Sequence, residues 1–327
     1  MRILSYNCRG LRNTSAVEKM KALLRWKYPD IVFLLETRLY KNEWKTKIKE
    51  PGFSDGRGVA AGANRAGDLL LMWREEVQVA IKDITLHYID AKVKMGNCKQ
   101  DWRLTVVYGW SKVRNKYQTC DLLHRLHQQV QIPWLVVGDF NLITDYLEKS
   151  GSREPYTKEM DMFRDCLENC GLEDCGYYGR TFTWENNREA EYYTEERLDR
   201  AVSNKEWIEC YPDMRVYHLE RCGSYHIPIQ IKLVLEEEEI TWGWSFRYER
   251  YWEKHDDCAK VIKDGWMENG SIPIMDRIKC CENKLRSWSK EAFGSLKQRS
   301  VKAEDAIKAL NKRKLTNAVL LQKKVLE

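Results

Sequence analysis

Short runs of β-branched and aliphatic residues recur through the first 235 residues, separated by helical patterns and polar loops. Runs of this kind are typical of buried β-strands. They predict strands at 2–6, 31–35, 68–73, 102–108, 134–137, 198–202 and 229–234. Helices are expected at 16–27, 117–129 and 158–170, the first opened by a capping box of Ser15 and Glu18 and the last ended by Gly171. Many strands with few helices favour two packed sheets flanked by helices over a sheet with a helix after every strand.

The sequence changes character after the acidic run at 236–239. Apolar residues then recur at three- and four-residue steps, the pattern of an amphipathic helix. They are Met275, Ile278, Cys281, Leu285, Trp288, Ala292 and Leu296. Residues 300–326 continue in the same style. We therefore expect a domain at 1–235 and a helical extension at 236–327, whose apolar stripes must be buried on each other, on the first domain or on a partner.

The net charge of +6 is concentrated in the extension. Residues 241–327 carry 19 Lys and Arg against 12 Asp and Glu, a net of +7, which leaves 36 against 37, or −1, for the remainder. A basic extension beside a neutral domain is typical of contact with nucleic acid, because phosphate binding is mainly electrostatic. Solvation of the outer helix faces by the same residues is an equally good explanation.

Composition is that of an ordinary globular protein, with 43% hydrophobic and 32% charged residues. No run approaches the roughly 18 to 20 consecutive apolar residues that a membrane span needs. The chain enters strand-like sequence directly after Met1, which leaves no room for a signal peptide. We therefore expect an intracellular protein that is neither secreted nor bound to a membrane.

Eleven cysteines are scattered along the chain without a Cys-x-x-Cys pair, so neither a disulfide framework nor a zinc ribbon is indicated. Cys166, Cys170 and Cys175 lie close together, but their spacing differs from that of zinc knuckles and no histidine is near them in the sequence. We expect reduced thiols in the core or on a helix face. His124 and His127 share a helix face, but two ligands do not make a metal site, and a solvated pair is expected.

Polar side chains stand at the ends of several expected strands. They are Asn7, Glu36, Tyr108, Asp139 and Asn141. Gly138 lets the backbone turn, so Asp139 and Asn141 can point to the same side. Each residue alone is weak evidence, because a carboxylate after an apolar run is commonly a solvated loop charge and Asp139 could cap a helix or form an Asx-turn.

The order of these residues along the chain is more specific. Together with Asp199 and His226, they occur in the order found in the endonuclease/exonuclease/phosphatase superfamily. Within it, residues 1 to about 235 most resemble the endonuclease domain of plant LINE-type non-LTR retrotransposon polyproteins. The segments that carry this resemblance are Tyr6-Asn7-Cys8-Arg9-Gly10-Leu11, Leu35-Glu36-Thr37-Arg38, Pro133-Trp134 through Gly138-Asp139-Phe140-Asn141, Phe182-Thr183-Trp184 and Glu196-Arg197-Leu198-Asp199-Arg200. Gly223-Ser224-Tyr225-His226 follows them in the order found in the superfamily. The extension resembles the stretch that precedes reverse transcriptase in those polyproteins.

The resemblance implies a DNase I-like, four-layered α/β/β/α sandwich and a phosphodiester-cleaving site that uses Mg²⁺ or Mn²⁺. Such hydrolysis needs a nucleophilic water and neutralisation of the charge on the transition state. By resemblance, Glu36 is the direct metal ligand, and Asn7 orients Glu36 or touches the metal shell. Mg²⁺ prefers carboxylate and water oxygens, which suits a single glutamate.

The remaining roles also come from the resemblance. Asp139 positions and deprotonates the attacking water, and Asn141 holds the same carboxylate or a phosphate oxygen. His226, oriented by Asp199, donates to a non-bridging phosphate oxygen. Tyr108 hydrogen-bonds the phosphate.

One position departs from the family, which carries aspartate where this chain has Tyr225. Loss of that carboxylate removes a negative charge that attracts Mg²⁺, and comparable losses around metal sites cost about 10- to 100-fold in affinity or activity. The sequence favours an endonuclease that nicks duplex DNA. If the protein functions as a DNA nuclease, we expect it in the nucleus. The alternative is a catalytically dead retroelement remnant that at most binds nucleic acid. A phosphatase acting on a small substrate is disfavoured, because the resemblance to retroelement segments is much closer.

Overall fold

The computed structural model describes residues 1–39, 43, 52–59, 68–95, 101–129, 132–151, 155–233, 252–253, 255–267 and 274–293. Its internal contacts divide the chain into two compact units, Met1–Leu235 and Glu236–Glu327.

The first unit contains two six-stranded mixed sheets and a small third one. The first sheet has the order β14 (Arg215–His218), β15 (Ile229–Lys232), β1 (Arg2–Asn7), β2 (Ile31–Leu35), β4 (Leu69–Arg74) and β3 (Phe53–Val59). The second has the order β10 (Glu173–Asp174), β13 (Asp199–Ser203), β8 (Trp134–Asp139), β7 (Trp102–Tyr108), β6 (Tyr88–Met95) and β5 (Val77–Ile84). The third consists of β11 (Trp184–Glu185), β12 (Thr194–Glu196) and β9 (Lys149–Gly151). In each large sheet one central pair is parallel, β1 with β2 and β7 with β8.

The two large sheets pack face to face around a fully buried apolar core. Alternate side chains of each strand point into this core, as the period of two in a β-strand requires. The first sheet contributes Ile3, Phe33 and Leu71, and the second contributes Val106, Leu135 and Val137. Burial of these side chains between the sheets is the main stabilisation of the unit.

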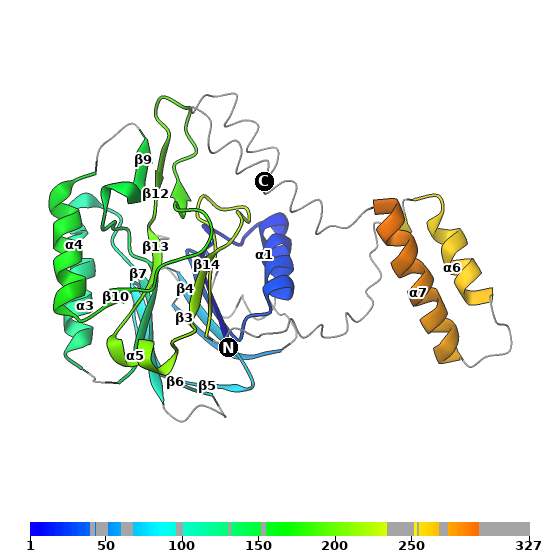
Figure 1. The fold of residues 1–327 in the computed structure, drawn as a ribbon, viewed down its shortest axis with the longest axis horizontal. Coiled ribbons are helices and arrows are strands. Elements are labelled where there is room, and N and C mark those ends of the chain that lie inside the picture. Colours follow the sequence, from blue (N-terminus) through cyan, green and yellow to red (C-terminus); the bar gives the residue numbers. More distant parts are fainter. Residues whose placement is uncertain are drawn as a thin grey trace. The chain divides into compact units, whose positions relative to one another are not determined.

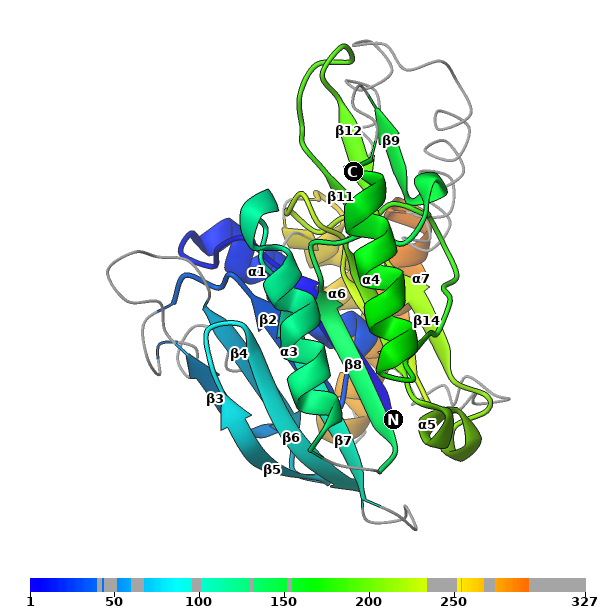
Figure 2. The ribbon, with the colours of Figure 1, turned by 90° about the vertical axis from the view of Figure 1, so that its left-hand side faces the viewer.

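Helices cover the outer face of each sheet (Figure 1). Helix α1 (Thr14–Lys27) buries Val17, Met20, Leu23 and Leu24 against the first sheet. Helices α3 (Tyr117–His127) and α4 (Thr157–Asn169) lie side by side over the second sheet (Figure 2). Shorter helices are η1 (Val113–Asn115), η2 (Tyr146–Glu148) and α5 (Lys205–Cys210). The arrangement is α/β/β/α, which confirms the predicted fold class.

The seven expected strands are present, with ends that move by one or two residues. Strands β3, β5, β6 and β14 were not predicted, because exposed, half-buried or charged side chains interrupt their apolar runs. The expected capping box of Ser15 and Glu18 is wrong. Asn13 takes the cap position instead, where its side chain accepts a 2.6 Å hydrogen bond from the N–H of Ala16, so the helix begins before Ser15.

In the second unit, α6 (Cys258–Met267) and α7 (Ile274–Phe293) pack against each other. Trp252, Cys258 and Leu285 are buried there, and Gly265 is needed because a Cβ at that position would lie 2.8 Å from Cα of Cys281. The expected apolar stripe is therefore buried at least partly between these helices. Leu296 and residues 300–326 lie outside the described residues. None of the helices in the described part of the chain is long and apolar enough to cross a membrane.

His218, at the end of β14, is a buried histidine that favours the neutral state. Its Nδ1 donates to the carbonyl oxygen of Arg180 at 2.7 Å, and its Nε2 has no hydrogen-bond partner among the described residues. Burial lowers the pKa of His218 from 6.5 to about 4. Below about pH 6.5, His218 binds a proton in the unfolded chain but not in the folded chain. The free energy of unfolding therefore falls by roughly 3 kcal/mol as the pH drops to about 4.

We expect His218→Asn to remove this part of the pH dependence, because the amide can still donate to Arg180 but does not titrate. The free energy of unfolding in urea, measured between about pH 7.5 and 4.5, tests this. The exposed His127→Asn is the matched control. Equal slopes for His218→Asn and the natural chain would show that His218 does not set the acid sensitivity.

Candidate active site

Strand topology brings the predicted residues to one end of the sandwich. Because β1 and β2 are parallel and pair Asn7 with Leu35, Asn7 and Glu36 emerge at the same edge of the first sheet. In the second sheet, Tyr108 pairs with Asp139, and Asp139 pairs with Asp199 on its other side. The two edges meet, since the side chain of Asn7 hydrogen-bonds that of Asp139.

Asn7 links two carboxylates across the sheets. Its Nδ2 donates to Oε1 of Glu36 and to Oδ2 of Asp139, both at 3.0 Å. The hydroxyl of Tyr108 donates to the same oxygen of Glu36 at 3.1 Å. Asn7 is fully buried and Asp139 nearly so, whereas Glu36 and Tyr108 are half-buried. The site is therefore buried at Asn7 and Asp139 and partly accessible to solvent at Glu36 and Tyr108.

His226 and Asp199 form a buried pair next to Asp139. Nδ1 of His226 lies 2.8 Å from Oδ2 of Asp199, and Nε2 lies 3.8 Å from Oδ2 of Asp139. Burial alone would lower the pKa of His226, but the carboxylates of Asp199 and Asp139 outweigh it and raise the pKa above its usual value. The imidazole is therefore fixed in orientation and readily protonated.

The pKa of Asp139 is raised, so its carboxylate can exchange a proton near neutral pH. Burial, followed by the charge of Asp199, raises the pKa of Asp139 to about 7. Its Oδ1 accepts a 3.0 Å hydrogen bond from the backbone N–H of Asn141. The side-chain amide of Asn141 is directed elsewhere, to the carbonyl oxygen of Gly109 at 2.9 Å. Asn141 thus holds the carboxylate through its backbone, and its side chain fixes the neighbouring loop.

The backbone is constrained at these positions. Glu36 and Asn141 have φ angles of +52° and +55°, in the left-handed region that few non-glycine residues occupy. Gly138 has φ of +147°, and a Cβ there would lie 2.0 Å from the carbonyl oxygen of Val107. Unusual conformations of this kind cluster at functional sites, where surrounding structure maintains them.

The donor set around Asn7 fits a hard divalent cation. Oδ1 of Asn7 is buried and has no hydrogen-bond partner among the described residues, a state that costs free energy unless another ligand satisfies it. Amide and carboxylate oxygens, which Asn7 and Glu36 supply, are the ligands that Mg²⁺ and Mn²⁺ prefer.

Asp139, Asp199 and His226 also place ligand atoms within 4.8 Å of one another. However, the hydrogen bond between His226 and Asp199 already occupies one ring nitrogen and one carboxylate oxygen. This group is therefore better suited to proton transfer than to metal binding.

Tyr225, the departure from the family pattern, lies at the edge of the site. Its side chain is 40% exposed, and its hydroxyl accepts a 3.2 Å hydrogen bond from Nδ2 of Asn187. The guanidinium of Arg9 lies 5.3 Å from the centre of the ring. The phenol is thus held by surface residues.

Two residues for which the sequence suggested no role hold the site together. Oγ1 of Thr183 accepts hydrogen bonds from the N–H groups of Leu198 and Asp199, at 3.0 and 2.9 Å. Oγ of Ser224 donates to the carbonyl oxygen of Asn7 at 2.8 Å and accepts from the N–H of His226. Thr183 lies in the segment Phe182-Thr183-Trp184 and Ser224 in Gly223-Ser224-Tyr225-His226. Their place in these motifs was the only feature of the sequence that pointed to the site.

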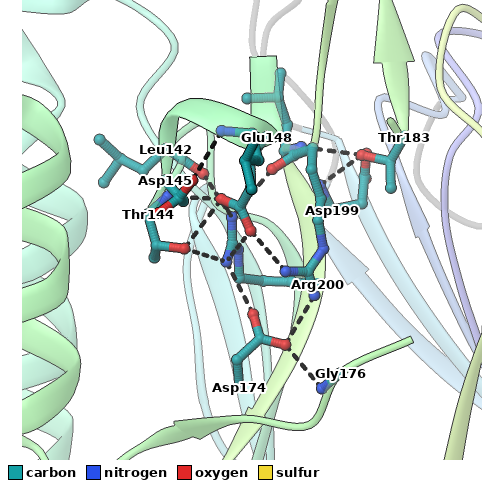
Figure 3. A network of polar contacts seen from close by, with 12 residues as sticks. Leu142, Thr144, Asp145, Glu148, Asp174, Gly176, Thr183, Asp199 and Arg200 are labelled. Carbon is teal, nitrogen blue, oxygen red and sulfur yellow. Dashed lines mark hydrogen bonds and ion pairs between the residues drawn. The ribbon is translucent and has the colours of Figure 1, made fainter. Parts of the chain in front are cut away.

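A buried ionic network supports the strand that carries Asp199 (Figure 3). Arg200, with 0% exposure, reaches Glu148 at 2.7 Å and Asp174 at 2.9 Å. Arg197 binds the same two carboxylates at 2.6 and 2.8 Å. Because the two arginines flank Asp199 in the chain, the network fixes its position, and loss of one partner would leave a buried charge uncompensated.

A family model described as the endonuclease/exonuclease/phosphatase family matches residues 4–226. No curated protein sequence matches the chain.

Several solved structures share the fold. One is the endonuclease domain of TRAS1, a telomere-specific non-LTR retrotransposon, with a TM-score of 0.56 and 13% identity over 72% of this chain and 99% of that one. Another is the AP endonuclease LMAP from Leishmania major, with a TM-score of 0.56 and 16% identity over 70% of this chain and 86% of that one. A third is the catalytic domain of Xenopus laevis APE2, with a TM-score of 0.54 and 17% identity over 71% of this chain and 91% of that one.

Proposed function

Because the chain belongs to the endonuclease/exonuclease/phosphatase family, whose members are hydrolases acting on phosphodiester bonds, we propose that its site cleaves the DNA backbone with Mg²⁺ or Mn²⁺. The observation that carries the proposal is the buried link from Glu36 through Asn7 to Asp139, with the unpaired Oδ1 of Asn7 beside it. The motif resemblance to retrotransposon endonucleases favours duplex DNA as the substrate and the nucleus as the place of action. The likeness in fold to the endonuclease domain of the TRAS1 retrotransposon supports this origin.

Each residue has a chemical role in this proposal. Glu36 and Oδ1 of Asn7 would hold the cation, which when bound would neutralise charge on the phosphate. Asp139, with its pKa of about 7, accepts a proton from the attacking water.

Two hydrogen-bond donors, His226 and Tyr108, contact the phosphate in this proposal. Nε2 of His226 donates to a phosphate oxygen, and Asp199 keeps the ring oriented. Burial and the charge of Glu36 raise the pKa of Tyr108, so its hydroxyl stays protonated and can donate to the phosphate.

The second candidate function is nucleic-acid binding without catalysis, by a retroelement remnant. The observation that favours it is Tyr225, which supplies no negative charge where the family carries one. The basic extension, with its net charge of +7 over residues 241–327, would contribute to such binding.

Tyr225→Asp separates the two functions. Restoring the carboxylate should raise the rate of plasmid nicking in Mg²⁺ by about 10- to 100-fold, because it adds negative charge near the metal. Nicking should stop when EDTA removes the cation and return when Mg²⁺ is added in excess. Tyr225→Asn is the matched control, since it removes the phenol without adding charge.

The outcomes differ clearly. Nicking by the natural chain supports the enzyme, and nicking by Tyr225→Asp alone supports the remnant. If neither chain nicks DNA in Mg²⁺ or Mn²⁺, the catalytic proposal fails.

A further inference from the structure

Helices α3 and α4 each carry two soft metal-ligand side chains four residues apart. On α3 these are Cys120 and His124, and on α4 they are Cys166 and, at the C-terminal cap, Cys170. Residues four apart lie on the same face of a helix. The two helices lie side by side (Figure 2). Cys120 and His124 of α3 and Cys166 of α4 line the groove between them.

The side chains meet closely. The ligand atoms of His124, Cys166 and Cys170 all lie within 4.8 Å of one another. Sγ of Cys166 lies 3.6 Å from the carbonyl oxygen of Cys120 on the opposite helix, and Sγ of Cys120 lies 3.8 Å from the carbonyl oxygen of Met162 on α4, so Cys120 is next to Cys166. No histidine is near these cysteines in the sequence because His124 reaches them from another helix. Of the expected solvated histidine pair, His127 is exposed, whereas His124 is half-buried beside Cys166 and Cys170.

The chemistry of this donor set differs from that of the active site. Thiolates and imidazole favour Zn²⁺, which is held tetrahedrally with Zn–S distances of about 2.3 Å and ligand atoms about 3.3–3.8 Å apart. The observed spread of up to 4.8 Å needs a contraction of about an ångström, which side-chain rotations can supply. Hydrogen bonding with Cys120 and Cys170, together with burial, raises the pKa of the Cys166 thiol, whereas the hydrogen bond with Cys166 lowers the pKa of Cys170. Metal binding to Cys166 would therefore release its proton.

An ion can reach the cluster from solvent. A groove between the two helices is lined by Cys120, His124 and Cys166, and His124 is half-buried. Asp121, Asp161 and Asp165 also line this groove. Lys158 lines the groove as well, and Asp161 is paired with Arg164, so Asp121 and Asp165 are the carboxylates that favour the approach of a cation.

We propose that His124, Cys166 and Cys170, with Cys120 as the fourth ligand, bind a Zn²⁺ ion that ties α3 to α4. The ion would stabilise the outer helical layer on the sheet that carries Tyr108 and Asp139. This site is separate from the proposed nuclease site, which offers only oxygen and nitrogen ligands.

Titration of the full, metal-free chain with Co²⁺ under reducing conditions tests the proposal. We expect one equivalent to bind with a thiolate-to-cobalt absorption band and tetrahedral visible bands, and Zn²⁺ to displace it. The thiolate band distinguishes this site from Asp139, Asp199 and His226. Glu36→Ala should leave the thiolate-to-cobalt band unchanged, so this readout does not depend on the proposed nuclease site.

Variants decide which residues bind. His124→Asn should weaken Co²⁺ binding by about tenfold or more and remove the rise in melting temperature that Zn²⁺ causes. His127→Asn, on the same helix, is the matched control and should behave like the natural chain. Cys166→Ser should weaken the thiolate band, because one of the three proposed thiolate ligands is removed. If that variant does not fold, His124→Asn still tests the site, because His124 is half-buried and tolerates substitution more readily. Absence of the thiolate band, or equal affinities for His124→Asn and His127→Asn, would show that the cysteines are core thiols only.

Discussion

Asp139→Asn should lower the rate of DNA nicking by about 10²- to 10⁴-fold, the usual contribution of a general base. The asparagine has nearly the size of the aspartate but cannot take a proton from water. It also changes the hydrogen bonding, since Asp139 accepts from Nδ2 of Asn7 and from the N–H of Asn141, and the new amide can accept only one of these bonds. Single-turnover nicking of supercoiled plasmid measures the effect, in the Tyr225→Asp chain if only that form is active.

The control for this change is Asp213→Asn, the same substitution in an exposed turn after α5. It should leave nicking within about twofold of the parent chain, because a surface charge change of this kind has little effect on structure. Circular dichroism and a melting curve show whether Asp139→Asn is folded. A folded Asp139→Asn chain that nicks DNA at the parental rate would remove Asp139 from the reaction.

Glu36→Gln should lower nicking by about 10²- to 10³-fold and raise the Mg²⁺ concentration needed for half-maximal activity. The oxygen of the glutamine can still accept the hydrogen bonds that Asn7 and Tyr108 donate to Glu36, so the substitution mainly removes charge. A metal ligand that loses its charge binds Mg²⁺ less tightly, and part of the activity should therefore return at high Mg²⁺.

Glu76→Gln, in the exposed turn between β4 and β5, provides the matched control. Nicking rates measured over a series of Mg²⁺ concentrations separate loss of affinity from loss of rate. Should Glu36→Gln show the same Mg²⁺ dependence and the same maximal rate as its parent, Glu36 would not be the metal ligand.

The sequence was sufficient to predict the fold class. Apolar runs at 2–6, 31–35 and 134–137 correspond to β1, β2 and β8, because burial on both faces of a central strand leaves a continuous apolar signature. Strands such as β5, with one exposed face, gave no such signature and were missed. The N-terminal end of α1 was misplaced because Ser15 and Asn13 are both good caps, and the local pattern does not say which one the chain uses.

The sequence by itself determined which polar residues stand at strand ends, because strand length and residue order are local properties of the chain. Tertiary structure alone decided which of them touch: Asn7 bridges to Asp139 only because two sheets pack, and His226 meets Asp199 only because distant segments converge. The same holds for Arg200 with Glu148 and for His124 with Cys166. A local pattern fixes backbone conformation and the face on which a side chain lies, whereas hydrogen bonds, burial and pKa shifts depend on packing between segments far apart in sequence.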